Sequence, residues 1–213
     1  LPSAEGFVRQ VIGWREYVWG VYLRWMPSYR GRNVLRAHRP LPPAFTGAGT
    51  EMACVAHTVE MLEQRGWVHH IERLMVLGNL ALLSGVEPDA MVEWMWASFV
   101  DGAEWVMLPN LVGMALHADG GKMATKPYAG GGAYIDRMSD HCGGCRYDPK
   151  RRTGQDACPF TTLYWDFLAR HRSRFAGNGR MRNQLAGLGR LSDLPDVRRR
   201  ATEVLDRLDD GTL

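Results

Sequence analysis

Four cysteines are the residues of this sequence whose type and spacing most directly suggest chemistry. Cys142 and Cys145 are separated by two glycines, Cys158 follows after twelve further residues, and Cys54 lies far upstream. Four thiolates can bind a zinc ion tetrahedrally or hold a 4Fe–4S cluster. A redox-active dithiol accompanied by two buried structural cysteines is a third interpretation. The Cys158–Pro159 pair is typical of cluster-binding sequences and favours iron.

Two adjacent histidines lie in the densest polar cluster of an otherwise apolar segment, residues 66–74. Neighbouring side chains of a helix point about 100° apart, so His69 and His70 cannot both face one ligand. Residues three and four apart share a face, which groups His69 with Arg73 and His70 with both Arg73 and Leu74. The alternative is a hydrogen-bonded core histidine next to a surface histidine.

These residues must be positioned by helices, because helical periodicity runs through almost the whole chain. Prolines and glycines crowd residues 26–50, and residues 118–132 have the composition of a loop. No alternating apolar pattern typical of strands is present. The sequence predicts an all-α domain with helices at residues 4–24, 52–65, 67–84, 88–99, 101–117 (kinked or broken at Pro109), 160–176 and from an N-cap at Ser192 onward.

Composition and charge narrow the class of protein. With 46% hydrophobic and 23% charged residues, the chain is not intrinsically disordered. Residues 146–182 hold nine basic and three acidic side chains, a local charge of +6 in a chain of net charge +3. Such a stretch is typical of phosphate-backbone binding, although a solvated basic surface has the same composition.

Targeting signals are missing from the sequence. No apolar run reaches the roughly 18–20 residues that a membrane span needs. No signal segment opens the chain, so we expect a cytoplasmic protein with reduced cysteines. The absent initiator methionine suggests a piece of a longer protein.

Longer motifs resemble the photolyase/cryptochrome family. Residues 66–74 are similar to the Gly-Trp-Ile-His-His-Leu-Ala-Arg helix of the (6-4) photolyases, and residues 7–17 resemble the family's Trp-Arg-Glu helix. Residues 119–128 and 134–142 are similar to the prokaryotic iron–sulfur branch of the family, and the four cysteines match its cluster pattern in order and spacing. The resemblance covers about residues 5–182.

This resemblance implies the C-terminal, FAD-binding half of such a protein. Residues 1–141 would form the helical catalytic domain, residues 142–182 an iron–sulfur and DNA-facing segment, and residues 183–213 a C-terminal helix and tail. An α/β domain with a lumazine- or folate-type antenna chromophore would precede them and is absent from this chain. The implied cofactors are FAD and a 4Fe–4S cluster. The implied partner is UV-damaged DNA, bound by a monomer away from any membrane.

The resemblance also gives the two histidines roles. In the family, reduced FAD passes one electron to a flipped-out pyrimidine dimer under blue or near-UV light, and the electron later returns. His70 matches the histidine that donates a proton or hydrogen bond to a (6-4) photoproduct, a task that suits a pKa near working pH. His69 would support it. Eukaryotic members carry a second histidine where this chain has Leu74.

Four residues match positions around the flavin. Arg73 matches an arginine that pairs with a carboxylate beside the isoalloxazine ring. Asp101 is the first choice for that carboxylate and Glu104 the second. Asn110 aligns with an asparagine near the flavin N5. The alternative for Asp101 is an ordinary solvent-facing acid near a helix end.

Other matches concern the lesion, the DNA backbone and electron transfer. Gln10, Trp14 and Tyr128 would line the lesion pocket, where a tryptophan can stack on an extruded base. Trp14 also lies on an apolar stripe, so core packing is its alternative role. Trp94 and Tyr134 are the candidates for electron transfer, and Phe45 stands where the branch usually has a tryptophan, for which Trp96 would substitute. We expect Arg151 and Arg152 to contact DNA phosphates.

Three functions therefore compete. The first is light-driven DNA repair, favoured by the proton donor and the stacking residue. The second is a cryptochrome-type photoreceptor with the same cofactors. The third is a flavin-free, cluster- or zinc-stabilised nucleic-acid-binding module, similar to the large subunit of archaeal-type primase.

Overall fold

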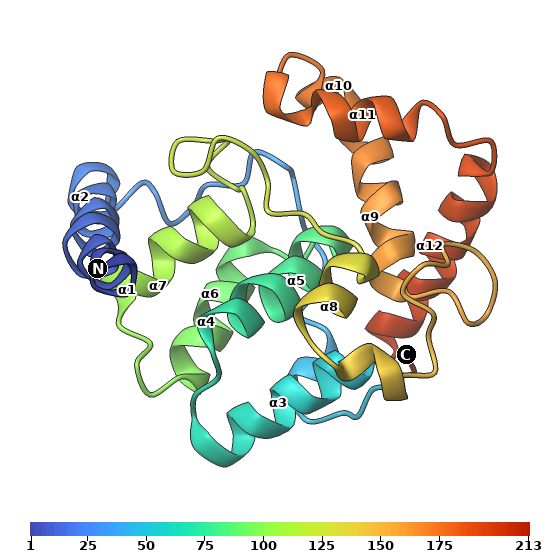
Figure 1. Cartoon of the computed structure of the whole chain (residues 1–213), viewed down its shortest axis with the longest axis horizontal. Helices are drawn as coiled ribbons and strands as arrows, with labels where there is room; N and C mark the ends of the chain where they lie inside the picture. Colours follow the sequence, from blue (N-terminus) through green and yellow to red (C-terminus); the bar gives the residue numbers. More distant parts are fainter.

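The computed structural model describes residues 1–213 and shows a domain built of helices (Figure 1). The β-type pairings are two isolated bridges, Arg39 with Val86 and Asp148 with Ala157. The prediction of an all-α domain is therefore confirmed. None of the helices combines the length and the apolar character needed to cross a bilayer.

The helices follow the predicted order closely. The first long helix consists of α1 (Pro2–Val8), a π-helical segment η1 (Arg9–Trp14) and α2 (Arg15–Trp25). The irregular connection 26–50 contains a single 3-10 turn, η2 (Pro43–Thr46). The others are α3 (Ala53–Arg65), α4 (His70–Glu72), π-helical η3 (Arg73–Gly78), α5 (Asn79–Ser84), α6 (Pro88–Ser98), α7 (Glu104–Pro109), π-helical η4 (Asn110–Ala115), α8 (Gly132–Met138), η5 (His141–Gly144), α9 (Pro159–Arg170), α10 (Arg172–Phe175), η6 (Gly179–Met181), α11 (Arg182–Leu188) and α12 (Leu194–Asp209).

The helix predicted at 67–84 begins only at His70. His69 is its N-cap: Nδ1 accepts a hydrogen bond from the backbone N–H of Ile71 at 3.2 Å, and the Glu72 carboxylate accepts one from the His69 N–H at 3.0 Å. This capping box satisfies two N–H groups that the helix start leaves free. His69 therefore does not share a helical face with Arg73, and that expectation was wrong.

Other boundaries also differ from the predictions. The last helix begins after Asp193 rather than Ser192, and the Asp193 carboxylate makes no capping bond because it binds the Arg152 guanidinium at 2.8 Å. The helix through Pro109 is not broken but changes to π-type hydrogen bonding directly after it. The short helices α8 and α11 were not predicted, because glycines at their ends and interiors obscure the helical pattern.

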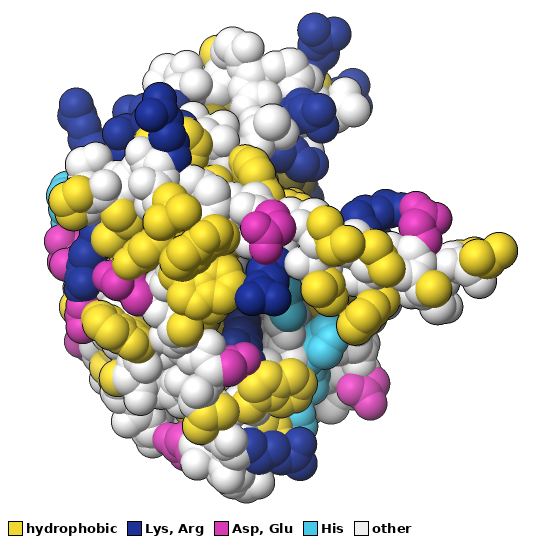
Figure 2. Space-filling model, turned by 90° about the vertical axis from the view of Figure 1, so that its left-hand side faces the viewer, with side chains coloured by type: hydrophobic (Ala, Val, Ile, Leu, Met, Phe, Trp, Pro, Cys, Tyr) yellow, Lys and Arg dark blue, Asp and Glu magenta, His cyan; other side chains and the backbone are white.

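One continuous apolar core of 47 residues runs from Val18 to Leu213. It includes residues of all three predicted segments, 1–141, 142–182 and 183–213. Every residue of α5 is buried, and this helix lies in the middle of the domain (Figure 1). The N-terminal helix differs, since no residue of α1 or η1 is buried. It projects from the body with apolar side chains such as Phe7 and Ile12 exposed (Figure 2).

Asn79 connects α5 to the loop 118–132. Its side chain is fully buried, donates to the Gly130 carbonyl at 2.8 Å and accepts from the Gly130 N–H at 3.0 Å. Both backbone groups of Gly130 are thereby satisfied where water cannot reach them.

We predict that Asn79→Ala lowers the free energy of unfolding by about 3 kcal/mol, because a buried donor and a buried acceptor lose their partner. Urea denaturation followed by circular dichroism measures this change. Gln64→Ala is the control, since that exposed amide bonds only to the Glu60 side chain, and it should shift stability by less than about 0.5 kcal/mol. A loss below about 1 kcal/mol for Asn79→Ala would show that Gly130 does not depend on it.

Candidate functional site

Two adjoining cavities bring together seven of the seventeen predicted site residues. The first, which we name the Arg73 cavity, has a volume of about 230 Å³ and is lined by Arg73, Asp101, His70 and Asn110 among others. The second, the Trp14 cavity, has a volume of about 450 Å³. The two cavities share the wall residues His70, Leu74, Val106, Asn110 and Met114.

The three π-helical segments of the domain all contribute to these walls. Gln10 and Trp14 come from η1, Arg73 and Leu74 from η3, and Asn110 from η4. π-Helical turns are rare and are enriched at functional sites. The sequence carries no signal for them, so this shared feature of the site could not be predicted.

Arg73 is the most constrained charged side chain at the cavities. Its guanidinium donates to both oxygens of Asp101 at 2.8 and 3.0 Å, and its Nε donates to the Val68 carbonyl at 2.9 Å. The Phe99 ring covers it, with 4.4 Å between the Arg73 Cζ and the ring centroid. Only 13% of the Arg73 side chain is exposed. A bidentate pair of this kind holds a positive charge in one orientation in the cavity wall.

His70 lies where the two cavities meet. Burial by the surrounding wall lowers the pKa of His70 below its usual value, and the positive charges of Arg73 and His69 lower it further. The ring is therefore neutral near neutral pH and has one nitrogen that donates and one that accepts.

Asn110 and Glu104, both expected near the flavin, occupy different places. Asn110 lines both cavities, and its amide donates to the Val106 carbonyl at 2.7 Å. Glu104 lines neither cavity; its carboxylate accepts a hydrogen bond from the Tyr22 hydroxyl at 2.8 Å, between α2 and α7. Asp101, not Glu104, is the carboxylate that the structure places on Arg73.

The Trp14 cavity is lined by Gln10, Trp14 and Tyr128 as well as His70. Trp14 is 38% exposed and meets Tyr17 edge to face at 5.9 Å, so it is not part of the buried core. Figure 2 shows the projecting N-terminal helix over a hollow in which histidine side chains lie. The arrangement offers an open aromatic wall beside an imidazole.

The four cysteines lie together in a separate place. Cys54 is in the first turn of α3, and Cys142 is in η5. Cys145 directly follows η5, and Cys158 directly precedes α9. All four line one pocket, and none is in a disulfide. A Cβ on Gly132 would lie 2.7 Å from the Cys158 Sγ, so only glycine allows α8 to start this close to the sulfur.

The state of these thiols bears on their chemistry. Burial raises the pKa of Cys54 and of Cys158, and burial with the neighbouring Cys158 raises the pKa of Cys142 to about 11. Thiols with raised pKa values are poor nucleophiles, whereas a bound metal centre would keep them as thiolates.

The spacing of the sulfurs bears on which metal centre fits. No three of the four sulfurs lie within 4.8 Å of one another. A single zinc ion with Zn–S bonds of about 2.3 Å would hold its tetrahedral sulfurs about 3.8 Å apart. The sulfurs are thus not drawn together as a zinc ion would hold them, and the four-thiol donor set itself suits either zinc or an iron–sulfur cluster.

Sequence reasoning missed Glu51, which ties the cysteine segment to the rest of the domain. Its carboxylate pairs with Arg146, accepts from Arg207 at 3.1 Å and accepts from the Tyr147 hydroxyl at 3.2 Å. The Cys145 sulfur lies 3.8 Å from the Glu51 carbonyl oxygen. A lone acid three residues before Cys54 carries no pattern that would have identified it.

Of the two electron-transfer candidates, Trp94 lies among aromatic rings and Tyr134 does not. Trp94 is half-buried and stacks on Phe45 with ring centroids 4.9 Å apart, and it meets Phe99 edge to face at 6.3 Å. Phe99 in turn covers Arg73. Tyr134 lies apart from this group on α8, half-buried, with Arg137 over its ring at 5.6 Å.

The two arginines expected at DNA phosphates are both in ion pairs. Arg151 pairs with Asp156 and, at 3.7 Å, with Asp148, while Arg152 binds Asp193. Neither lines the two cavities. Their charge is thus partly neutralised within the protein.

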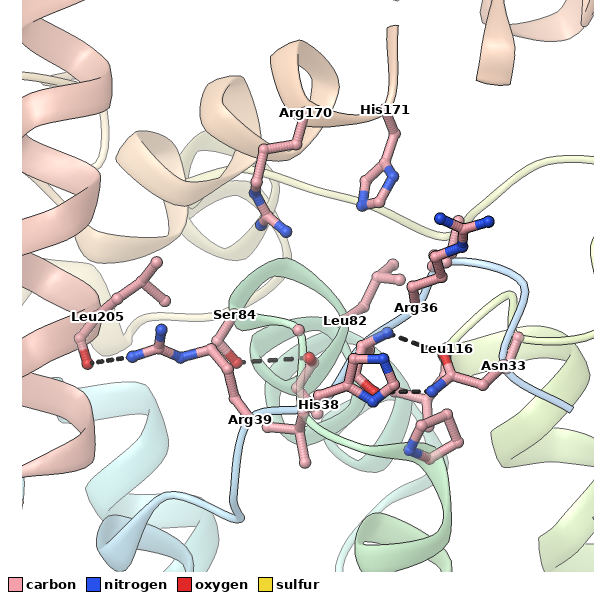
Figure 3. Close-up of a pocket in the computed structure, with 17 residues that line it drawn as sticks. Asn33, Arg36, His38, Arg39, Leu82, Ser84, Leu116, Arg170, His171 and Leu205 are labelled. Carbon is pink, nitrogen blue, oxygen red and sulfur yellow. Dashed lines mark hydrogen bonds between the residues drawn. The ribbon is translucent and has the colours of Figure 1, made fainter. Parts of the chain in front are cut away.

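A third cavity, of about 350 Å³, lies between loop 33–39 and the end of α9 (Figure 3). None of the predicted site residues lines it. Its basic side chains are largely structural: Arg39 pairs with Asp209 and bonds to the Leu205 carbonyl, and Arg170 pairs with Asp166 at 2.7 Å. No acidic residue lines this cavity. The basic residues in its lining are Arg36, His38, Arg39, Arg170 and His171.

Comparison with known proteins gives two relatives. A (6-4) photolyase of Agrobacterium fabrum is 46% identical over 211 residues, which cover 98% of this chain and 42% of that protein. The chain thus spans less than half the length of this relative. An uncharacterised protein of Acanthamoeba polyphaga mimivirus is 26% identical over 134 residues, 63% of this chain and all of that protein. No known family profile matches the chain.

We predict that His171, at the third cavity, makes stability depend on pH. Burial, followed by the charges of Arg170 and Arg174, lowers the pKa of His171 from 6.5 to about 4. The unfolded chain therefore binds more protons between these values, and stability should fall by about 2 kcal/mol as pH drops from 6.5 to 4. Urea denaturation at pH 7 and pH 4.5 measures the slope. His171→Gln should reduce the loss of stability between pH 7 and pH 4.5. His38→Gln, at an exposed histidine of the same cavity, should leave that loss unchanged. If His171→Gln loses as much stability as the unsubstituted protein, the assignment to His171 is contradicted.

Proposed function

Because the chain belongs to the photolyase family, we propose that it forms the helical part of a light-driven DNA-repair enzyme. The observation that carries this proposal is the pair of adjoining cavities that share His70 and Asn110. One cavity would hold FAD beside Arg73 and Asp101. The other would hold a pyrimidine dimer that has been rotated out of the duplex.

The residues of the Arg73 cavity suit a flavin. Reduced FAD, when bound and excited by light, supplies the electron that the lesion receives and returns. The fixed guanidinium of Arg73 would stabilise negative charge on the bound group, and Asp101 would keep the guanidinium in place. One N–H of the Asn110 amide donates to the Val106 carbonyl, which leaves its second N–H to donate to a ligand and its oxygen to accept from one.

The residues of the Trp14 cavity suit an extruded base, and we propose the (6-4) photoproduct as the lesion. Trp14 would stack on it, an interaction worth about 1–3 kcal/mol, with Gln10 and Tyr128 at the rim. From between the cavities, the neutral ring of His70 would donate a hydrogen bond to the lesion, and negative charge on a bound group would raise its pKa and let it give a proton. His69 would act by holding the start of α4, since its ring is committed to capping.

We propose that the remaining walls of the flavin site come from sequence beyond this chain, which spans 42% of its bacterial relative. The exposed apolar side chains of the projecting N-terminal helix are suited to such packing. An α/β domain with a lumazine- or folate-type antenna would belong to the same additional part. Residues 1–141 would then be the catalytic part, 142–182 the cluster segment and 183–213 the C-terminal helix and tail.

We propose a 4Fe–4S cluster on Cys54, Cys142, Cys145 and Cys158. Their convergence on one pocket, the burial of Cys54 and Cys158, and a donor set of four thiols that such clusters use support it. The cluster would hold η5 and the residues before α9 against α3, which is a structural role. Its chemistry does not enter the repair steps assigned above.

The DNA backbone would be bound by the basic stretch 146–182. Arg151 and Arg152 remain candidates, but the arginines without carboxylate partners would contribute more. Figure 2 shows basic side chains at the top of the molecule, where α10 and α11 lie in Figure 1. Phosphate contacts of this kind do not depend on base sequence. Trp94 and Tyr134 would carry electrons to the flavin from outside. Trp94 contacts Phe99, the ring that covers Arg73.

The proposed function is tested with the full-length natural protein, purified without oxygen. After reduction, blue light should repair an oligonucleotide with a single (6-4) photoproduct, and His70→Ala should slow repair 100-fold or more, in the range expected for a lost acid catalyst. His38→Ala is the control and should repair at the original rate. A flavin that photoreduces without any repair would identify a photoreceptor, and a protein without flavin would overturn both light-driven functions.

The cluster is tested by metal analysis and visible absorption of the same protein. We expect about four iron atoms per chain and a broad absorption that Cys158→Ser abolishes, because a serine oxygen is a poor cluster ligand. Met138→Ser, an exposed change on the neighbouring helix, should retain the iron. One zinc and no iron per chain would refute the cluster.

A further inference from the structure

A second group of metal-ligating side chains lies beside the cysteines. His57, Glu72 and His141 each offer a ligand atom, and these atoms all lie within 4.8 Å of one another. They come from three different elements: His57 from α3, Glu72 from α4 and His141 from η5. No other three histidine, cysteine or carboxylate groups of the chain converge in this way.

The two imidazoles are already close. The ring centroids of His57 and His141 lie 4.9 Å apart, with an angle of 44° between the ring planes. His57 is exposed and His141 and Glu72 are half-buried, so the group opens to solvent. Neither histidine is paired with an acid elsewhere in the domain.

The Glu72 carboxylate is fixed from one side only. Its Oε2 accepts the His69 N–H at 3.0 Å, which holds the side chain at the start of α4. No lysine or arginine forms an ion pair with it. Its second oxygen therefore remains available to a ligand, at a site where two imidazoles converge.

We propose that His57, Glu72 and His141 form a binding site for a first-row divalent transition metal such as zinc. Two imidazoles and one carboxylate with an open fourth position are a donor set that zinc and iron(II) take up readily, whereas magnesium and calcium require oxygen donors. Zn–N and Zn–O bonds of about 2.0–2.1 Å place such ligands about 3.4 Å apart. Rotation of the exposed His57 side chain, with smaller adjustments of the half-buried Glu72 and His141 side chains, would close the difference.

This site adjoins the four cysteines, since His141 lines their pocket and directly precedes Cys142. It shares no donor with them, and it faces solvent while Cys54 and Cys158 are buried. A metal here would link α3 and η5 to the cap of α4, the helix that begins with His70 at the junction of the cavities. It would therefore stiffen the connection between the cysteine segment and the cavity wall.

The test is isothermal titration of zinc into the full-length protein with its cofactors in place, after treatment with a weak chelator. We expect one equivalent to bind with a micromolar Kd. His57→Ala, His141→Phe and Glu72→Gln should each weaken binding tenfold or more. Phe retains the ring contact and Gln retains the cap on His69, so folding is preserved. His38→Ala should leave zinc binding unchanged.

Cobalt(II) identifies the donors independently. Bound at the proposed site it should show weak visible bands without the intense near-ultraviolet absorption of cobalt–thiolate bonds, and Glu72→Gln should remove these bands. Absence of zinc binding, binding that all three variants retain, or thiolate absorption that Cys142→Ser removes would each overturn the proposal. None of these outcomes depends on light or repair. The test of the metal site is therefore independent of the test of the proposed function.

Discussion

The ion pair of Arg73 with Asp101 is the interaction on which the shape of the site depends. The guanidinium is almost buried at 13% exposure, whereas the carboxylate keeps 49% of its surface in water. Removing the carboxylate would leave a nearly buried positive charge with the Val68 carbonyl as its remaining partner, an arrangement that costs several kcal/mol in protein interiors. The loop that follows α6 is therefore held against the start of η3. Gly66 makes this approach possible, because a Cβ there would lie 2.6 Å from the Val100 side chain.

Around this fixed charge, π-helical turns shape the cavity walls. A π-turn inserts one residue into the i→i+4 ladder, which shifts the side chains after it around the helix. In η4 the Leu116 N–H bonds to the Leu111 carbonyl, five residues back. Pro109 helps to explain this segment, since proline cannot donate to the α-helical ladder and the bonding changes directly after it. Gly78 in η3 lies so close to η4 that a Cβ would be 2.9 Å from the Ala115 side chain.

The sequence predicted the helical class, most helix positions and the convergence of residues far apart in the chain. The sequence succeeded with the four cysteines, whose spacing predicted the pocket that they share, whereas the pairing of Asp101 with Arg73 was implied only by the family resemblance. It failed where the deciding interaction is tertiary. The capping role of His69 depends on Glu72, and the helix start at Leu194 depends on Arg152 taking the carboxylate of Asp193. π-Turns and the position of Glu104 on Tyr22 likewise follow from packing that no local pattern encodes.

The loop 118–132 explains how a structural cysteine centre can matter for a cavity elsewhere. At its start, the buried carboxylate of Asp119 accepts from the Tyr29 hydroxyl at 2.7 Å and from the N–H groups of three loop residues. Near its end, Asn79 holds Gly130, and Gly132 packs against the Cys158 sulfur. Tyr128, at the Trp14 cavity, lies four residues before that sulfur contact. Because both ends of the loop are fixed in the core, displacing Cys158 would move the end that positions Tyr128. The cysteine segment therefore supports the cavity through backbone geometry.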